Sequence, residues 1–132
     1  MAFRLEREKT KTSPYVLIEE ERGYIRLEGE SYLEDVIGFF TEITEWLTNY
    51  LASDFKELTF DCAMEYFNSS TTKQIYNMLR LIDSNASGKK AVVNWIVPNE
   101  DDDMLIECGE DYRDEMENLE FNLVIRADAS KF

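Results

Sequence analysis

The sequence predicts an α/β fold, with a single domain built on a mixed sheet of about five strands and helices mainly on one face. Apolar runs of strand length alternate with segments of helical periodicity, which favours parallel strand pairing through crossover helices. The central strand carries charged residues, Asp61 and Glu65, on its second face, whereas a strand covered on both faces is apolar throughout. The expected strands lie at 15–18, 24–28, 58–66, 91–97 and 121–126.

The N-terminal part of the chain predicts a hairpin, and the segment before it is consistent with two alternative structures. Residues 1–12 are rich in alternating charges with few apolar anchors, which fits either an edge strand or a flexible arm. The apolar runs at 15–18 and 24–28 have strand length, and Gly23 supplies the permissive backbone of the turn between them. These two strands are therefore expected to pair antiparallel.

Helical spacing of apolar residues predicts three helices. The first is expected from about residue 31 to 52, because Ser31 and Glu34 have the spacing of a capping box. The second follows the polar run at 68–72 and ends at about residue 85. The inner side of the third helix is expected to carry Met104 or Leu105, followed by Cys108, Tyr112 and Met116.

The junction between the central strand and the second helix is the most informative stretch. A strict alternation places one set of side chains on the buried face of the strand, namely Leu58, Phe60, Cys62, Met64 and Tyr66. Asn68, Ser69, Ser70, Thr71 and Thr72 follow, and such residues cap the free amides of a helix. One or two caps suffice, and a hydroxyl at a helix N-terminus is also a favourable place for an added phosphate. Two interpretations remain open: a cap alone, or a cap that is also a phosphoacceptor.

Composition excludes several classes of function. The 132 residues carry a formal net charge of −14, which disfavours nucleic acid and anionic membranes as partners. No apolar run is long enough to span a membrane and the N-terminus is charged, so we expect a cytoplasmic protein. The absence of histidine rules out a Ser-His-Asp or Cys-His site, and the two cysteines are too few for a disulfide framework. No catalytic residue, metal ligand or cofactor is assigned.

An enzyme built on carboxylates is the less favoured alternative. The acidic run from Glu100 to Asp103 offers oxygen ligands for magnesium, but consecutive helical residues do not face the same way, and acids at a helix start compensate its dipole. Glu110, Asp111 and Asp114 are expected on a solvated face. A Gly-rich phosphate loop is absent from the sequence.

The strand–helix junction resembles the phosphorylated segment of anti-sigma-factor antagonist (STAS) domains. It is closer to the SiaC family of regulatory phosphoproteins, whose Tyr-Leu-Asn-Thr-Ser-Ser pattern is similar to the residues from Tyr66 to Thr71 here. Two further segments are similar to that family: Gly-Glu-Ser-Tyr ending at Tyr32, and the acidic Asp-Met and Gly-Glu-Asp sequences between 102 and 111. The resemblance implies a single STAS-like domain over the whole chain.

The resemblance also implies a function. The family's phosphoacceptor Thr falls on Ser69, with Ser70 and Thr71 as alternatives, and a dedicated kinase and a PP2C-like phosphatase set its state. The unphosphorylated protein is expected to bind a diguanylate cyclase in a cyclic-di-GMP pathway that controls biofilm formation. The expected partner-binding residues are Tyr32, Tyr66, Phe67, Asn68 and Ser70. The alternatives are a constitutive interaction module, in which the hydroxyl run is only a cap, and the carboxylate enzyme.

Overall fold

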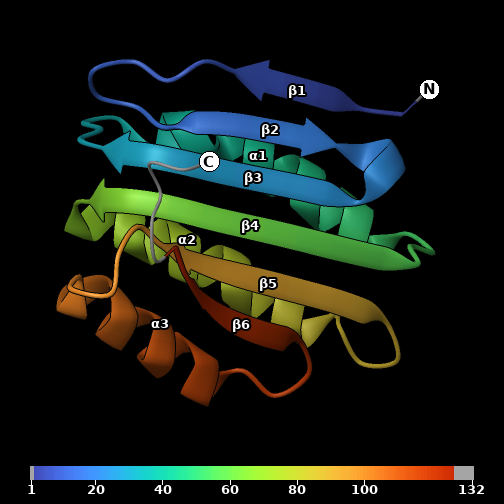
Figure 1. Ribbon diagram of the computed structural model, residues 1–132. Coiled ribbons are helices and arrows are strands. Elements are labelled where there is room, and N and C mark those ends of the chain that lie inside the picture. The colour runs from blue at the N-terminus through green and yellow to red at the C-terminus, as the bar shows by residue number, and fades with distance from the viewer. Residues whose placement is uncertain (1, 127–132) are drawn as a thin grey trace.

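The computed structural model describes residues 2–126 and contains one six-stranded sheet in which each strand lies beside its neighbour in the sequence (Figure 1). The strands are β1 (Arg4–Arg7), β2 (Tyr15–Glu19), β3 (Tyr24–Ser31), β4 (Glu57–Phe67), β5 (Lys90–Val97) and β6 (Glu120–Ile125). The helices are α1 (Val36–Ala52), α2 (Ser69–Ser84) and α3 (Asp103–Glu115). Strands β1 to β3 pair antiparallel and β3 to β6 pair parallel, which confirms the predicted mixed sheet.

The sheet has one strand more than expected because the N-terminal segment forms an edge strand. Leu5 of β1 lies opposite Ile18 of β2, and Phe3 stacks on Trp46 of α1 with ring centroids 6.3 Å apart. These apolar contacts anchor a segment whose other side chains are mostly charged and exposed. Of the two forms that the sequence left open, the edge strand is the one found for Arg4–Arg7.

The helices form one layer, as predicted, and α1 and α2 lie behind the sheet in Figure 1. Their apolar faces cover alternate residues of the strands, including Leu27, Phe60 and Met64, which are buried. The opposite face of the sheet is polar at its centre. There Asp61 accepts hydrogen bonds from the hydroxyl of Tyr24 at 2.6 Å and from the side-chain amide of Asn94 at 2.8 Å.

Helix α1 begins later than the sequence suggested. Asp35 caps it by accepting a hydrogen bond from the amide of Gly38 at 3.0 Å, and the first helical residue is Val36. The predicted capping box of Ser31 and Glu34 is therefore wrong. Ser31 instead ends β3 and is fully buried.

Helix α3 packs on β5 and β6 through small and aromatic residues. The indole of Trp95 on β5 donates a hydrogen bond to the carbonyl of Leu105 at 2.9 Å. Gly109 lies so close to Trp95 that a Cβ atom there would be 2.5 Å from the indole ring. Leu105 is buried, whereas Met104 is 83% exposed, so the inner side of the helix begins at Leu105.

Candidate functional site

A β-bulge near the end of β4 determines which way the first site residues face. The register between β3 and β4 shifts, so that Gly29 lies opposite Met64 but Glu30 lies opposite Tyr66. A bulge inserts one residue into one strand and reverses the alternation beyond it. Tyr66, predicted on the buried face with Met64, is instead 45% exposed, and that prediction is wrong. Phe67 takes the inward direction.

Tyr66 forms an exposed aromatic pair with Tyr32. The two rings stack with centroids 4.8 Å apart at 23°, although 34 positions separate the residues in the sequence. Tyr32 is 46% exposed, and its hydroxyl donates a hydrogen bond to Glu30 at 2.6 Å, which raises the pKa of the phenol. Paired tyrosines present a large, rigid, amphipathic surface, which is typical of protein-binding sites.

Phe67 lies half-buried beside a small hollow at the carboxyl end of β4. Its ring meets the buried indole of Trp95 edge-on, with centroids 6.0 Å apart. The hollow has a volume of about 330 Å³ and lies between β4, α2 and α3. Its walls are formed by Glu65, Tyr66, Phe67, Thr72, Asp102, Met104, Leu105 and Cys108. The exposed Met104 thus belongs to the same surface as the predicted partner-binding residues.

Asn68 caps α2 and also ties it to the preceding loop. Its side-chain oxygen accepts hydrogen bonds from the amide of Thr71 at 3.1 Å and from the hydroxyl of Ser70 at 3.3 Å. Its side-chain amide donates to the carbonyl of Leu33 at 3.1 Å. Because both ends of this side chain are engaged, Asn68 fixes the N-terminus of α2, and its part in binding a partner stays a prediction.

The three candidate hydroxyl groups lie in different environments. Ser69 and Ser70 are exposed in the first turn of α2. Thr71 is fully buried, and its hydroxyl lies 2.7 Å from that of Ser31. A kinase cannot reach Thr71 in the folded protein, so the structure removes it as an alternative phosphoacceptor and leaves the two serines.

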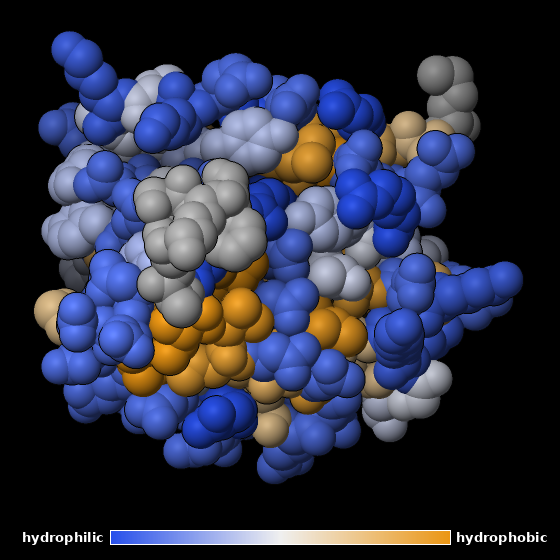
Figure 2. Space-filling view, in the orientation of Figure 1, coloured by the Kyte–Doolittle hydropathy of each residue, from blue (hydrophilic) through white to orange (hydrophobic). Residues whose placement is uncertain are grey.

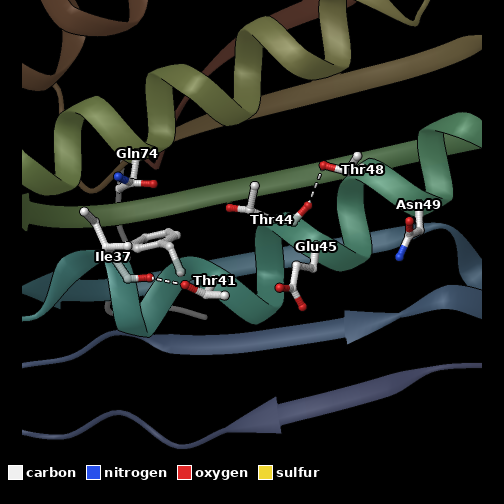
Figure 3. Close-up of a pocket in the computed structure, with 8 residues that line it drawn as sticks. Ile37, Thr41, Thr44, Glu45, Thr48, Asn49 and Gln74 are labelled. Carbon is white, nitrogen blue, oxygen red and sulfur yellow. Dashed lines mark hydrogen bonds between the residues drawn. The ribbon is translucent and has the colours of Figure 1, made fainter.

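A groove between α1 and α2 was not foreseen from the sequence. It has a volume of about 400 Å³, and Figure 3 shows its lining residues along α1 with Gln74 on the neighbouring α2. Ile37 at one end is 73% exposed. The hydroxyls of Thr41 and Thr48 donate to the carbonyls one turn earlier, so their methyl groups are left for the walls. The groove exists only because the two helices pack together, and the sequence carries no separate signal for it.

The described residues show neither a metal centre nor a membrane span. In residues 2–126, no group of three or more Cys, Asp or Glu side chains is arranged to hold a metal ion. Within the same residues, no helix is both long and apolar enough to cross a bilayer. The acidic run from Glu100 to Asp103 serves instead at the start of α3, where Asp102 accepts a hydrogen bond from the amide of Leu105 at 3.3 Å.

The chain matches one known protein family over nearly its whole length. Residues 7–126 match the model of the SiaC family regulatory phosphoproteins. The chain belongs to the SiaC family. A curated relative is the uncharacterized protein PA14_02130 of Pseudomonas aeruginosa (strain UCBPP-PA14), which is 24% identical over 119 residues, or 89% of this chain and 91% of the relative.

Solved structures of SiaC from Pseudomonas aeruginosa share this fold. One is SiaC in complex with the diguanylate cyclase SiaD, which it activates; the TM-score is 0.86 at 21% identity, over 92% of this chain and 99% of that one. Another is apo-SiaC, with a TM-score of 0.80 at 23% identity, over 95% of this chain and 99% of that one. The six-stranded architecture is therefore the SiaC architecture.

Proposed function

We propose that this SiaC family protein is a non-enzymatic switch that binds an effector protein through the end of β4 and is controlled by phosphorylation of Ser69. The observation that carries the proposal is the exposure of Ser69, three residues after the Tyr66 that stacks on Tyr32, with the neighbouring Thr71 buried. A modifying enzyme has access to the hydroxyl without unfolding the helix, and the modification falls next to a surface suited to binding.

The start of α2 suits an added phosphate. Asn68 caps the amide of Thr71 and leaves the amides of Ser69 and Ser70 at the positive end of the helix dipole. Lys73 is exposed and four residues further along, so it lies on the same face of α2 as Ser69. A phosphate at Ser69 is thus stabilised by the helix and by a cation, and the fold is kept.

The phosphate acts by opposing the effector contact. It adds a charge of roughly −1.5 to −2 at pH 7 three residues after Tyr66, whose side chain forms a wall of the hollow together with Phe67 and Met104. Burying a dianion in an apolar contact is unfavourable. The unphosphorylated form therefore binds the effector through Tyr32, Tyr66 and Phe67, with Ser70 at the rim of the contact. The phosphorylated form is released from the effector.

The effector is a diguanylate cyclase under this proposal, which connects the switch to cyclic-di-GMP signalling and biofilm formation. Support comes from the fold shared with SiaC in complex with the cyclase SiaD. A protein kinase adds the phosphate and a PP2C-like phosphatase removes it, as the family resemblance implies. The regulatory nature of the family supports a binding role rather than catalysis by this chain.

The test measures binding of the cognate cyclase by calorimetry to wild type, Ser69→Ala and Ser69→Asp. We expect Ser69→Ala to bind like wild type and Ser69→Asp to bind at least ~10-fold more weakly, a loss of about 1.4 kcal/mol. Ser87→Asp, at an exposed position after α2, is the matched control for added charge and should bind normally. Equal affinities for all four proteins would favour a constitutive interaction module. Mass spectrometry of protein from its native host should find phosphate on Ser69.

A further inference from the structure

Among residues 2–126, the outer edge of β6 has no further strand beside it and lacks the usual protecting charges. Strand β6 is the last of the sheet, and within residues 2–126 no strand lies beyond it (Figure 1). Charged side chains on an edge strand normally prevent it from pairing with another chain. Strand β1, at the other edge of the sheet, carries such charges on Arg4, Glu6 and Arg7. In β6 the whole run from Phe121 to Ile125 is uncharged.

The register of β6 shows which backbone groups face outward. The amide of Arg126 donates to the carbonyl of Val97 on β5 at 2.9 Å. Backbone groups of successive residues in a strand point to opposite sides, so the even-numbered residues face β5. The amides and carbonyls of Phe121, Leu123 and Ile125 therefore point away from β5. These three residues are enough to form a short ladder of hydrogen bonds with another strand.

The edge is complementary to a second copy of itself. When two β6 strands pair antiparallel about a two-fold axis at Leu123, Phe121 of one lies opposite Ile125 of the other, and both have outward backbone groups. Glu120 then lies opposite Arg126. Both side chains are on the face of the sheet away from the helices, because Glu120 lies opposite Val92 on β5 and residues alternate along the strand. Each dimer would contain two such charge pairs.

We propose that this chain forms a symmetric dimer through β6, which joins two six-stranded sheets into one. A shift of the register by two residues would separate Glu120 from Arg126, so the charges select one pairing. Val124 and Ile125 are each 40% exposed, and Figure 2 shows apolar surface where β6 lies in Figure 1. The net charge of −14 on each chain opposes association, so the dimer is expected to depend on concentration.

The first test is the mass in solution of the full chain, measured by sedimentation equilibrium from micromolar to millimolar concentration. We expect the mass to rise from the 15.5 kDa of one chain towards twice that value. A mass of one chain across the whole range overturns the proposal.

Charge reversal tests the surface and the register together. Glu120→Lys alone and Arg126→Glu alone each place like charges opposite one another twice, and each should weaken the dimer at least ~10-fold. A mixture of the two variants restores both attractions and should give a heterodimer as stable as the wild-type dimer. Glu117→Lys, an exposed change of the same charge outside β6, is the control and should dimerise normally. A dimer that is indifferent to both reversals would show that another surface is used.

Discussion

The hydroxyl oxygens of Ser31 and Thr71 lie 2.7 Å apart and hydrogen-bond to each other in the protein interior. Ser31 ends β3 and Thr71 lies in the first turn of α2, so the bond joins the edge of the sheet to the proposed regulatory helix. Because both side chains are fully buried, the bond fixes the rotation of that turn. With Thr71 facing inward, Ser69 and Ser70 face solvent.

Replacing Thr71 by valine should destabilise the protein by about 1–3 kcal/mol, because the buried hydroxyl of Ser31 loses its partner. Urea denaturation measures the change. The matched variant Ser31→Ala with Thr71→Val removes both hydroxyls and should cost less than the sum of the two single changes. Strictly additive costs would show that the two hydroxyls are not coupled.

Tyr66→Ala should weaken effector binding at least ~10-fold while lowering the free energy of unfolding by no more than about 1.5 kcal/mol, because the half-exposed ring loses its stacking on Tyr32. Calorimetry with the cognate cyclase gives the first value and urea denaturation the second. Tyr15→Ala, at a tyrosine of β2 whose hydroxyl donates to Glu6, is the control and should not change the affinity. Unchanged affinity for Tyr66→Ala would exclude the stacked tyrosines from the contact.

Asp83 at the end of α2 should make stability depend on pH. This buried carboxylate accepts hydrogen bonds from the amides of Glu117, Asn118 and Leu119 at 2.7–3.2 Å. Burial alone would raise the pKa of Asp83, but these bonds outweigh it and lower the pKa. A carboxyl with a lowered folded-state pKa contributes stability that is present above the unfolded-state pKa and is lost as pH falls through the folded-state pKa.

Asp83→Asn should therefore cost about 2–3 kcal/mol at pH 7, because charged hydrogen bonds to three amides are replaced by neutral ones. The difference from wild type should shrink as the pH falls below about 4, the ordinary pKa of an aspartic acid. Thermal unfolding between pH 7 and pH 2 measures both effects. A difference that stays constant over this range would contradict the assigned role.

Gly109→Ala should destabilise the packing of α3 by about 1–3 kcal/mol, although alanine is the better helix former. A Cβ atom at this position would lie 2.5 Å from Trp95 and 2.9 Å from Leu123, so the helix would have to move. Tryptophan fluorescence during urea unfolding reports this change directly. Gly38→Ala is a poor control because it clashes with Asp35; Asn77→Ala on the exposed side of α2 should be nearly neutral.

Cys62 should resist alkylation in the folded protein. Burial raises the pKa of its thiol to about 12, so the reactive thiolate is scarce at pH 8. Cys108 is half-buried, and burial raises the pKa of its thiol as well. Mass spectrometry after iodoacetamide treatment should find Cys62 unmodified in buffer and modified in urea, and rapid native modification of Cys62 would contradict this.

Much of the fold could be predicted from local patterns. The period of two at Leu58, Phe60, Cys62 and Met64 predicts a strand with one buried face, and these residues are buried in β4. The charge of Asp61 on the opposite face correctly indicated a single layer of helices. In the N-terminal segment, sparse apolar residues did not distinguish an arm from an edge strand, because the inter-strand hydrogen bonds of β1 all come from its pairing with β2.

The candidate site was only partly accessible to sequence reasoning. The hydroxyl run after β4 is a local signal, and Asn68 does cap α2 as expected. The inward direction of Thr71 depends on Ser31, and the outward direction of Tyr66 depends on a bulge defined by the register with β3. Neither partner is near in the sequence, so no local pattern could reveal them.

The sequence by itself determined the order and type of five strands and three helices, the polar run that caps α2 and the family, since these follow from residue types at short spacing. Only the tertiary structure decided which hydroxyls face solvent, which tyrosines stack and which edge of the sheet is left open. Those features depend on contacts between strands and helices far apart in the chain, and burial is a property of the packed molecule rather than of any single segment.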